Sequence, residues 1–205
     1  MKVKVCGMTE AKQIKDLIQM GIDYAGMIFY EKSPRYVVGK IEPEELKNLS
    51  KEIQLTGVFV NEEIEVVQKR INEFHLSAVQ LCGEETPDYC EELRQSVGVL
   101  KVVPVYEDVD IFLLKKYADV CDYFLFDTQS KKYGGTGVQF NWDLLTKMEI
   151  NKPFFLSGGI GENDVDRILQ FHQDQFYAID INSRFEISPG KKNMPVIKLF
   201  LEQIN

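Results

Sequence analysis

The chain has 205 residues, of which 44% are hydrophobic, and its formal net charge at neutral pH is −8. This amount of apolar sequence fills one hydrophobic core, or two small ones at most. Nucleic acids and anionic membranes need a basic protein surface, so the acidic balance excludes both as main partners. A local basic pocket for one small anion stays compatible with it.

The cysteines and histidines are few and are not spaced as metal ligands. The four cysteines form no CxxC pair, and the two histidines, His75 and His172, complete no zinc spacing. Both histidines are predicted to lie inside helical stretches. A disulfide scaffold is not expected in a long chain so poor in cysteine, and no signal peptide or membrane span is visible. The sequence therefore predicts a cytoplasmic single domain over residues 1–205, without a bound metal.

Short apolar runs alternate with helical patterns along the whole chain. The eight predicted strand and helix pairs are, in chain order, Val3–Cys6 and Glu10–Met20, Tyr24–Phe29 and Pro43–Ser50, Leu55–Val60 and Glu62–Phe74, Ala78–Leu81 and Pro87–Gln95, Val99–Val105 and Ile111–Ala118, Tyr123–Phe126 and Trp142–Lys147, Phe154–Leu156 and Glu162–Phe171, and Phe176–Ile181 and Pro195–Ile204. Thr9 and Asn61 are predicted to be the N-caps of the helices that follow the first and third strands, and Gly21 is predicted to end the first helix.

Eight strand–helix units, at roughly one per 25 residues, predict an α/β fold with a parallel sheet closed into a compact (β/α)₈ TIM barrel. The competing architecture is an open doubly wound sheet, which usually carries a Gly-rich phosphate turn after its first strand. Here the first strand is followed by Cys-Gly-Met-Thr and no GxGxxG motif is present. The closed barrel is therefore the predicted fold.

In this fold the functional site lies where the strands end at their carboxyl side. A thiol, an acid, a cation and two turns rich in glycine or hydroxyl groups are expected to meet there. The residues concerned are Cys6, Arg35, Asn61, Cys82, Asp127, Ser157 to Gly159, and Asp180 to Arg184. Asp127 ends a buried aromatic strand and precedes the loop Gly134–Gly137, an arrangement typical of an active site. Position alone also fits a solvated aspartate, and Cys6 alone also fits a small buried hydrophobic side chain.

At these residues the sequence resembles the phosphoribosylanthranilate isomerases. The matching segments occur in order over the whole chain: Lys4–Thr9, Gly26–Phe29, Ser33–Tyr36, Gly57–Asn61, Val79–Leu81, Phe126–Asp127, Gly134–Gly137, Phe140–Trp142, Gly158–Gly159, Glu162–Asn163, Asp180–Glu186 and Gly190–Lys192. Each segment is weak alone, whereas the ordered set is specific.

The resemblance implies an Amadori rearrangement of N-(5′-phosphoribosyl)anthranilate in tryptophan biosynthesis, with neither metal nor cofactor. By the same resemblance Asp127 matches the general acid that opens the furanose ring, and Cys6 matches the general base that removes the C2′ proton. Burial is expected to raise the pKa of Asp127, and a nearby cation or helix N-terminus is expected to lower the pKa of Cys6.

The substrate contacts are also implied by the resemblance. Arg35 is expected to bind the anthranilate carboxylate, because its guanidinium is a planar fork that is always charged. The phosphate is expected on the turns after the last two strands, and Asp180 is expected to face the ribose hydroxyls. The full set of expected substrate-binding residues is Arg35, Gly135, Gly158, Gly159, Asp180, Ser183 and Arg184.

The sequence departs from the family pattern at three places. Cys82 stands where histidine is common, Asn182–Phe185 replaces Ser-Ser-Gly-Val, and Asn193 replaces an acid as the predicted cap of the last helix. These changes leave Cys6 and Asp127 in place and alter the segment that is expected to contact the phosphate. Another phosphosugar isomerase and a catalytically silent binding barrel stay open as alternatives, as do a monomer and a homodimer.

Overall fold

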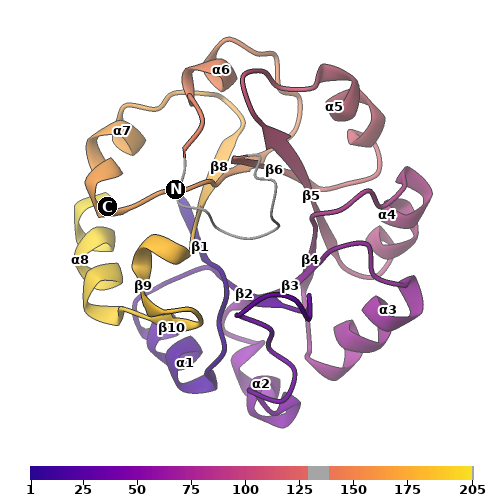
Figure 1. Cartoon of the computed structure of the whole chain (residues 1–205), viewed down its shortest axis with the longest axis vertical. Helices are drawn as coiled ribbons and strands as arrows, with labels where there is room; N and C mark the ends of the chain where they lie inside the picture. Colours follow the sequence, from indigo (N-terminus) through magenta and orange to yellow (C-terminus); the bar gives the residue numbers. More distant parts are fainter. Residues whose placement is uncertain (129–138, 205) are drawn as a thin grey trace.

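The structure is a computed structural model, and it describes residues 1–128 and 139–204. Eight parallel strands close into one barrel in the order β1 to β8, and the helices surround it on the outside (Figure 1). Strand β8 pairs with β1, placing Lys4 opposite Asp180, and this pairing closes the sheet. The predicted (β/α)₈ fold is therefore confirmed.

The barrel strands are β1 (Lys2–Val5), β2 (Tyr24–Ile28), β3 (Gln54–Phe59), β4 (Ala78–Leu81), β5 (Gly98–Val105), β6 (Tyr123–Thr128), β7 (Phe154–Leu156) and β8 (Phe176–Ile181). The helices are α1 (Ala11–Gln19), α2 (Pro43–Leu49), α3 (Ile64–Glu73), α4 (Pro87–Arg94), α5 (Ile111–Tyr117), α6 (Asp143–Thr146), α7 (Val165–Leu169) and α8 (Met194–Ile204). Two short 3₁₀ helices, η1 (Glu162–Asp164) and η2 (Ser183–Phe185), follow β7 and β8.

The amino-terminal half of the barrel interior is filled with side chains. Successive residues of a strand face opposite sides, so one set of strand residues points inward. Tyr24, Leu125 and Phe155 belong to a buried cluster separate from the larger core that packs strands against helices. The ring centroids of Tyr24 and Phe155 are 5.2 Å apart, and the hydroxyl groups of Tyr24 and Tyr177 lie 3.0 Å apart. Polar side chains can gather inside the barrel only nearer the carboxyl ends of the strands.

Asn193 caps α8 as predicted, because its Oδ1 accepts the backbone N–H of Val196 at 3.4 Å. The other two predicted N-caps, Thr9 and Asn61, are wrong for one physical reason. The hydroxyl of Thr9 donates to the carbonyl of Gly190 at 2.8 Å, and α1 begins after Glu10 without a side-chain cap. The side-chain oxygen of Asn61 accepts from the backbone N–H of Glu84 at 2.6 Å, and α3 begins after Glu63. Contacts between distant parts of the chain have replaced the local cap in each case. Gly21 does follow the end of α1, with a φ of 75°.

The structure contains an element that the sequence patterns did not predict. After β8 the chain forms η2 and then an antiparallel pair, β9 (Glu186–Ser188) and β10 (Lys191–Lys192). Figure 1 shows this pair beside α1 and α8. The predicted helix Glu162–Phe171 is in fact divided into η1 and α7. Within the described ranges no helix is long and apolar enough to cross a membrane.

Candidate active site

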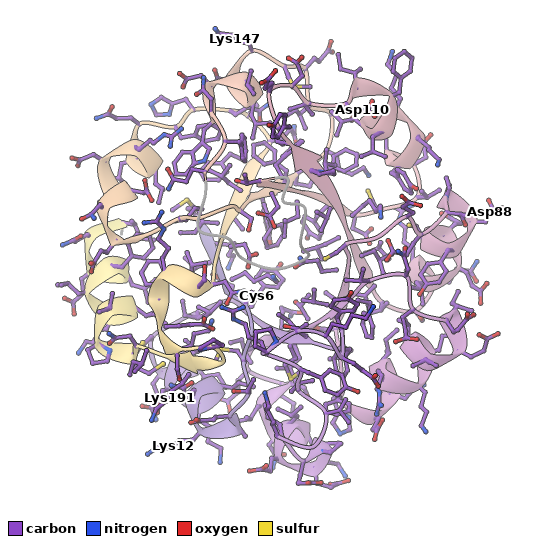
Figure 2. The ribbon with its side chains drawn as sticks, in the orientation of Figure 1. Cys6, Lys12, Asp88, Asp110, Lys147 and Lys191 are labelled. Atoms are coloured by element: carbon purple, nitrogen blue, oxygen red, sulfur yellow. The ribbon has the colours of Figure 1, made fainter. Side chains whose placement is uncertain are left out.

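Four adjacent strands bring residues of the predicted site to the carboxyl end of the barrel. Asp127 lies in β6, Ser157 follows β7, Asp180 lies in β8, and Cys6 follows β1. The backbone amide of Cys6 donates to Ile181, and the backbone amide of Ser157 donates to Phe126, so the residues after the strands continue the barrel ladder. In Figure 2 Cys6 lies within the ring of strands, whereas Lys12 and Asp88 lie on the outer surface. The barrel therefore places the thiol and the acids around one opening.

Asp127 lies one residue before the end of β6, slightly deeper than the sequence predicted. Its Oδ1 accepts the backbone N–H of Thr128 at 2.8 Å. Burial, and after it the negative charge of Asp180, raise the pKa of Asp127 to about 6, against smaller opposing effects of the Thr128 amide and Lys4. The carboxyl group can therefore carry a proton near neutral pH, which agrees with the expected direction.

Gly158 leaves the room that the Asp127 carboxylate occupies. Its φ is 90°, and a Cβ at this position would meet Thr128 Oγ1 and would lie 3.1 Å from Asp127 Oδ1. Gly39 has a similar φ of 80° but nothing within 4 Å of such a Cβ. A side chain at Gly39 would meet only backbone strain, whereas a side chain at Gly158 would meet both backbone strain and steric crowding.

We expect Gly158→Ala to lower the free energy of unfolding by about 2–4 kcal/mol, since left-handed strain and overpacking add. Gly39→Ala, which introduces the strain alone, is expected to cost about 1–2 kcal/mol. Urea unfolding of both variants measures the difference. Equal losses would show that the space beside Asp127 is not restricted as described.

Cys6 is 4% exposed, and its thiol lies against Gly26, where a Cβ would come within 2.9 Å of the Sγ. Burial raises the pKa of Cys6, and this outweighs the lowering by Lys4 and Lys192. The expected lowering is therefore wrong in its net direction. Two cations do act on the thiol as predicted, but a dry position favours the neutral form more strongly.

A buried polar network centred on Lys4 and Asp180 acts electrostatically on both Cys6 and Asp127. Lys4 Nζ donates to Asp180 Oδ1 at 2.8 Å and to Gln80 Oε1 at 2.7 Å, and Ser157 Oγ donates to Asp180 Oδ2 at 3.0 Å. Lys4 is fully buried. Although burial alone would lower the pKa of Lys4, the charge of Asp180 raises it above its ordinary value, so the ammonium stays charged. Asp180 is thus held by two side chains, of which the sequence singled out only Ser157.

Cys82 lies in the same small cluster as Cys6 but is not suited to carry a proton. Gln80 Nε2 donates to its sulfur at 3.3 Å, and burial raises the pKa of Cys82 to about 12. Asn61, also expected at this opening, uses its side chain to hold the backbone of Glu84. Neither residue offers acid–base chemistry near neutral pH.

Arg35 lies in a cluster of buried charges with two residues of the β9–β10 pair, Glu186 and Lys192. The hydrogen bond from Arg35, together with Lys192, lowers the pKa of Glu186 although burial opposes this. Both residues stand in segments that support the family resemblance, yet neither was assigned a role. No periodic pattern marks a two-stranded pair this short, so the sequence does not show that Glu186 and Lys192 meet Arg35.

The turns after β7 and β8 are neighbours, as expected for one anion site. Gly158 and Gly159 have φ values of 90° and 68°, and a Cβ on Gly161 would lie 3.0 Å from Arg184 Cδ. Ser183 and Arg184 form η2. Gly135, the remaining predicted substrate residue, lies outside the described residues.

The residues described here contain no group of three or more His, Cys, Asp or Glu side chains that could hold a metal ion. His75 and His172 do not lie inside helices as predicted. They follow α3 and α7 and so precede the next strands, at the opposite end of the barrel from the site.

A closed parallel barrel with a protonatable acid, a thiol and buried cations at the carboxyl ends of its strands is the arrangement of a (β/α)₈-barrel enzyme. Residues 3–203 match the family described as N-(5'phosphoribosyl)anthranilate (PRA) isomerase, and the chain belongs to this family. The predicted resemblance, and with it membership in a family of isomerases, is confirmed.

Individual relatives are similar to this chain over almost the whole of both sequences. The N-(5'-phosphoribosyl)anthranilate isomerase of Phocaeicola vulgatus is 40% identical, over 100% of this chain and 98% of its own. The crystal structure of phosphoribosyl anthranilate isomerase from Thermotoga maritima is 32% identical, with a TM-score of 0.83 over 99% of this chain and 98% of its own. A phosphoribosyl anthranilate isomerase solved in complex with reduced 1-(o-carboxyphenylamino)-1-deoxyribulose 5-phosphate is 30% identical, with a TM-score of 0.82 over 99% and 97% of the two chains.

Proposed function

We propose that this protein catalyses the Amadori rearrangement of N-(5′-phosphoribosyl)anthranilate to 1-(2-carboxyphenylamino)-1-deoxyribulose 5-phosphate, a step of tryptophan biosynthesis. Asp127 is the general acid and Cys6 the general base. Family membership supports the reaction class. The observation that carries the two roles is the pKa of Asp127 near 6 in an opening that also contains the thiol.

Asp127 performs the first proton transfer. At pH 7 a carboxyl group with a pKa of about 6 is protonated in roughly a tenth of the molecules, far more than an ordinary aspartate. Its proton passes to the furanose ring oxygen, the C1′–O bond breaks, and the nitrogen lone pair forms an iminium. Asp127 is left as the carboxylate.

Cys6 performs the second transfer as the thiolate. It removes the C2′ proton, and the C2′–H electrons neutralise the iminium to give an enolamine, which tautomerises to the ketone. Because burial disfavours the thiolate, the positive charges of Lys4 and Lys192 are needed to make it accessible. The substrate and product are isomers, so the reaction consumes no co-reactant.

The proposed substrate contacts are those that the family resemblance implies. Arg35 binds the anthranilate carboxylate, and Asp180, held by Lys4 and Ser157, faces the ribose hydroxyls. The phosphate binds the neighbouring turns that carry Gly158, Gly159, Ser183 and Arg184, the usual phosphate position in this fold. We retain Gly135 as a substrate contact. A cytoplasmic location, and a monomer or a homodimer, are likewise predictions that cell fractionation and light scattering test.

Turnover of freshly generated phosphoribosylanthranilate tests the proposed function, followed as the loss of anthranilate-type fluorescence. We expect saturable turnover by the wild type and none by the heat-unfolded protein. A folded wild type that binds the reduced product analogue without converting the substrate would replace the isomerase with a silent binding barrel. Failure both to bind and to convert would remove the phosphoribosylanthranilate assignment altogether.

A further inference from the structure

The β9–β10 pair is fixed firmly to the first strand–helix unit. The backbone N–H of Lys192 donates to Oε1 of Gln13 in α1 at 3.0 Å, and Nε2 of Gln13 donates to the carbonyl of Lys192 at 2.9 Å. The hydroxyl of Thr9 donates to the carbonyl of Gly190 at 2.8 Å. The backbone N–H of Gly190 in turn donates to Glu186 Oε1 at 3.1 Å. The side chains of Glu186 and Lys192 are therefore presented from a rigid support.

Glu186 holds one edge of the Arg35 guanidinium. Nε of Arg35 donates to Oε1 at 2.9 Å, and Nη2 donates to Oε2 at 2.6 Å. The two side chains are only 9% and 4% exposed. Nη1 of Arg35 has no hydrogen-bond partner within the described part of the chain, so the edge formed by Nη1 and the second proton of Nη2 is left for a ligand. Because the guanidinium is planar, fixing one of its edges also fixes the direction of the other edge.

The stem of Arg35 passes directly beside the proposed base. A Cβ on Gly7, the residue after Cys6, would lie 2.6 Å from Cδ of Arg35 and 2.8 Å from Oδ1 of Asn182. The φ of Gly7 is 77°, a second reason for glycine at this position. The guanidinium of Arg35 therefore begins next to the segment that carries the thiol.

Lys192 prevents Glu186 from cancelling the charge of Arg35. Its Nζ lies 2.8 Å from Glu186 Oε1 and 2.8 Å from Asn182 Oδ1, and its side chain is fully buried. Two cations and one carboxylate leave a net charge of +1 in the cluster. An ion pair that served only to join two loops would need no second buried cation, since desolvating each charge is costly.

We infer that Glu186 and Lys192 are positioning residues for carboxylate recognition: Glu186 orients the open edge of Arg35 toward the ring carboxylate of the substrate, and Lys192 keeps the cluster cationic. This inference rests on the proposed function and deepens it. The substrate class selected in this way is an N-phosphoribosylated aromatic amine with a carboxylate ortho to the nitrogen.

Calorimetric titration with two probes tests the inference. One is reduced 1-(o-carboxyphenylamino)-1-deoxyribulose 5-phosphate, and the other is the same compound without the ring carboxylate. We expect the wild type to prefer the carboxylated probe. Glu186→Gln and Lys192→Met are each expected to reduce this preference at least about tenfold, while affinity for the other probe changes less than about threefold. Lys191→Met, a neighbouring exposed lysine of β10, is the matched control and is expected to keep the preference.

Glu186→Gln also separates orientation from net charge. The substitution raises the charge of the cluster, so a purely electrostatic site would bind the carboxylated probe more tightly, and this result would overturn the positioning role. An unchanged preference in folded Glu186→Gln and Lys192→Met proteins would overturn the inference as a whole. If Glu186→Gln does not fold, Lys192→Met still decides the role of the second cation. A wild type that binds neither probe would instead remove the proposed function.

Discussion

Asp127→Asn is expected to lower kcat/KM by about 10²–10⁴-fold, the usual contribution of a general acid. The amide has nearly the same shape, so the hydrogen bond from the Thr128 amide can persist and the site keeps its packing. What is lost is the proton that the raised pKa of Asp127 retains near neutral pH. Steady-state kinetics at pH 7 measure the loss, with Asp88→Asn on the outer surface as the control.

The same substitution is expected to remove one pH-dependent part of the stability. The pKa of Asp127 is raised from 3.8 to about 6 by folding, so between these values the folded state holds a proton that the unfolded state has released. Wild-type stability therefore falls as pH rises through this window, by about 3 kcal/mol at most, and stays lower above it. The side-chain amide of the variant cannot titrate. The stability of the variant relative to the wild type is then larger at pH 8 than at pH 4.

Urea unfolding of both proteins at these two pH values measures this difference. A relative stability that does not change with pH would show that Asp127 has an ordinary pKa. An Asp127→Asn protein with wild-type kcat/KM would show that another group protonates the ring oxygen.

Lys4→Met is expected to lower the free energy of unfolding by about 3–5 kcal/mol, because it leaves the buried carboxylate of Asp180 without its ion-pair partner. It also removes a positive charge that lowers the pKa of Cys6, so we expect kcat/KM to fall at least about tenfold. Denaturant unfolding and steady-state kinetics give the two values.

Two further variants separate these effects. Lys4→Met with Asp180→Asn removes the whole ion pair and is expected to recover at least about half of the lost stability. Lys101 is a matched control: it is also buried, and its Nζ lies 2.7 Å from Glu85 Oε2, away from the thiol. We expect Lys101→Met to lose similar stability while the folded protein keeps kcat/KM within about threefold. Equal activity losses in the two lysine variants would mean that Lys4 acts only on folding.

The barrel was predictable because the same pattern, a short apolar run followed by a helical segment, is repeated along the chain. Eight apolar runs at regular spacing admit few architectures, and Ala78–Leu81, Phe154–Leu156 and Phe176–Ile181 were predicted with their observed bounds. The cap of α8 by Asn193 was predictable from the sequence. The caps expected at Thr9 and Asn61 were not, because these side chains have partners that are distant in sequence. The β9–β10 pair was missed because strands of three and two residues are too short to show a periodic pattern.

The sequence predicts which residues lie at the site, but it does not predict how their charges and their burial shift the pKa of the thiol. The fold alone places Cys6, Asp127 and Asp180 at the same end of the barrel. Whether a thiol is acidic there depends on the balance between burial and the charges of Lys4 and Lys192, and one of these lies almost at the other end of the sequence. In the sequence, Lys4 is simply one polar residue of a short strand. Only the closure of β8 against β1 shows that it faces Asp180.

The most direct test of the assignment of Cys6 as the base that removes the C2′ proton is a comparison of kcat/KM. The three proteins compared are the wild type, Cys6→Ser and Cys90→Ser. Cys90 is also buried and lies in α4, so its substitution controls for placing a hydroxyl in a dry position. We predict that Cys6→Ser lowers kcat/KM by at least about 10²-fold, whereas Cys90→Ser stays within about threefold of the wild type. A folded Cys6→Ser protein that keeps wild-type kcat/KM would contradict the assignment of the base.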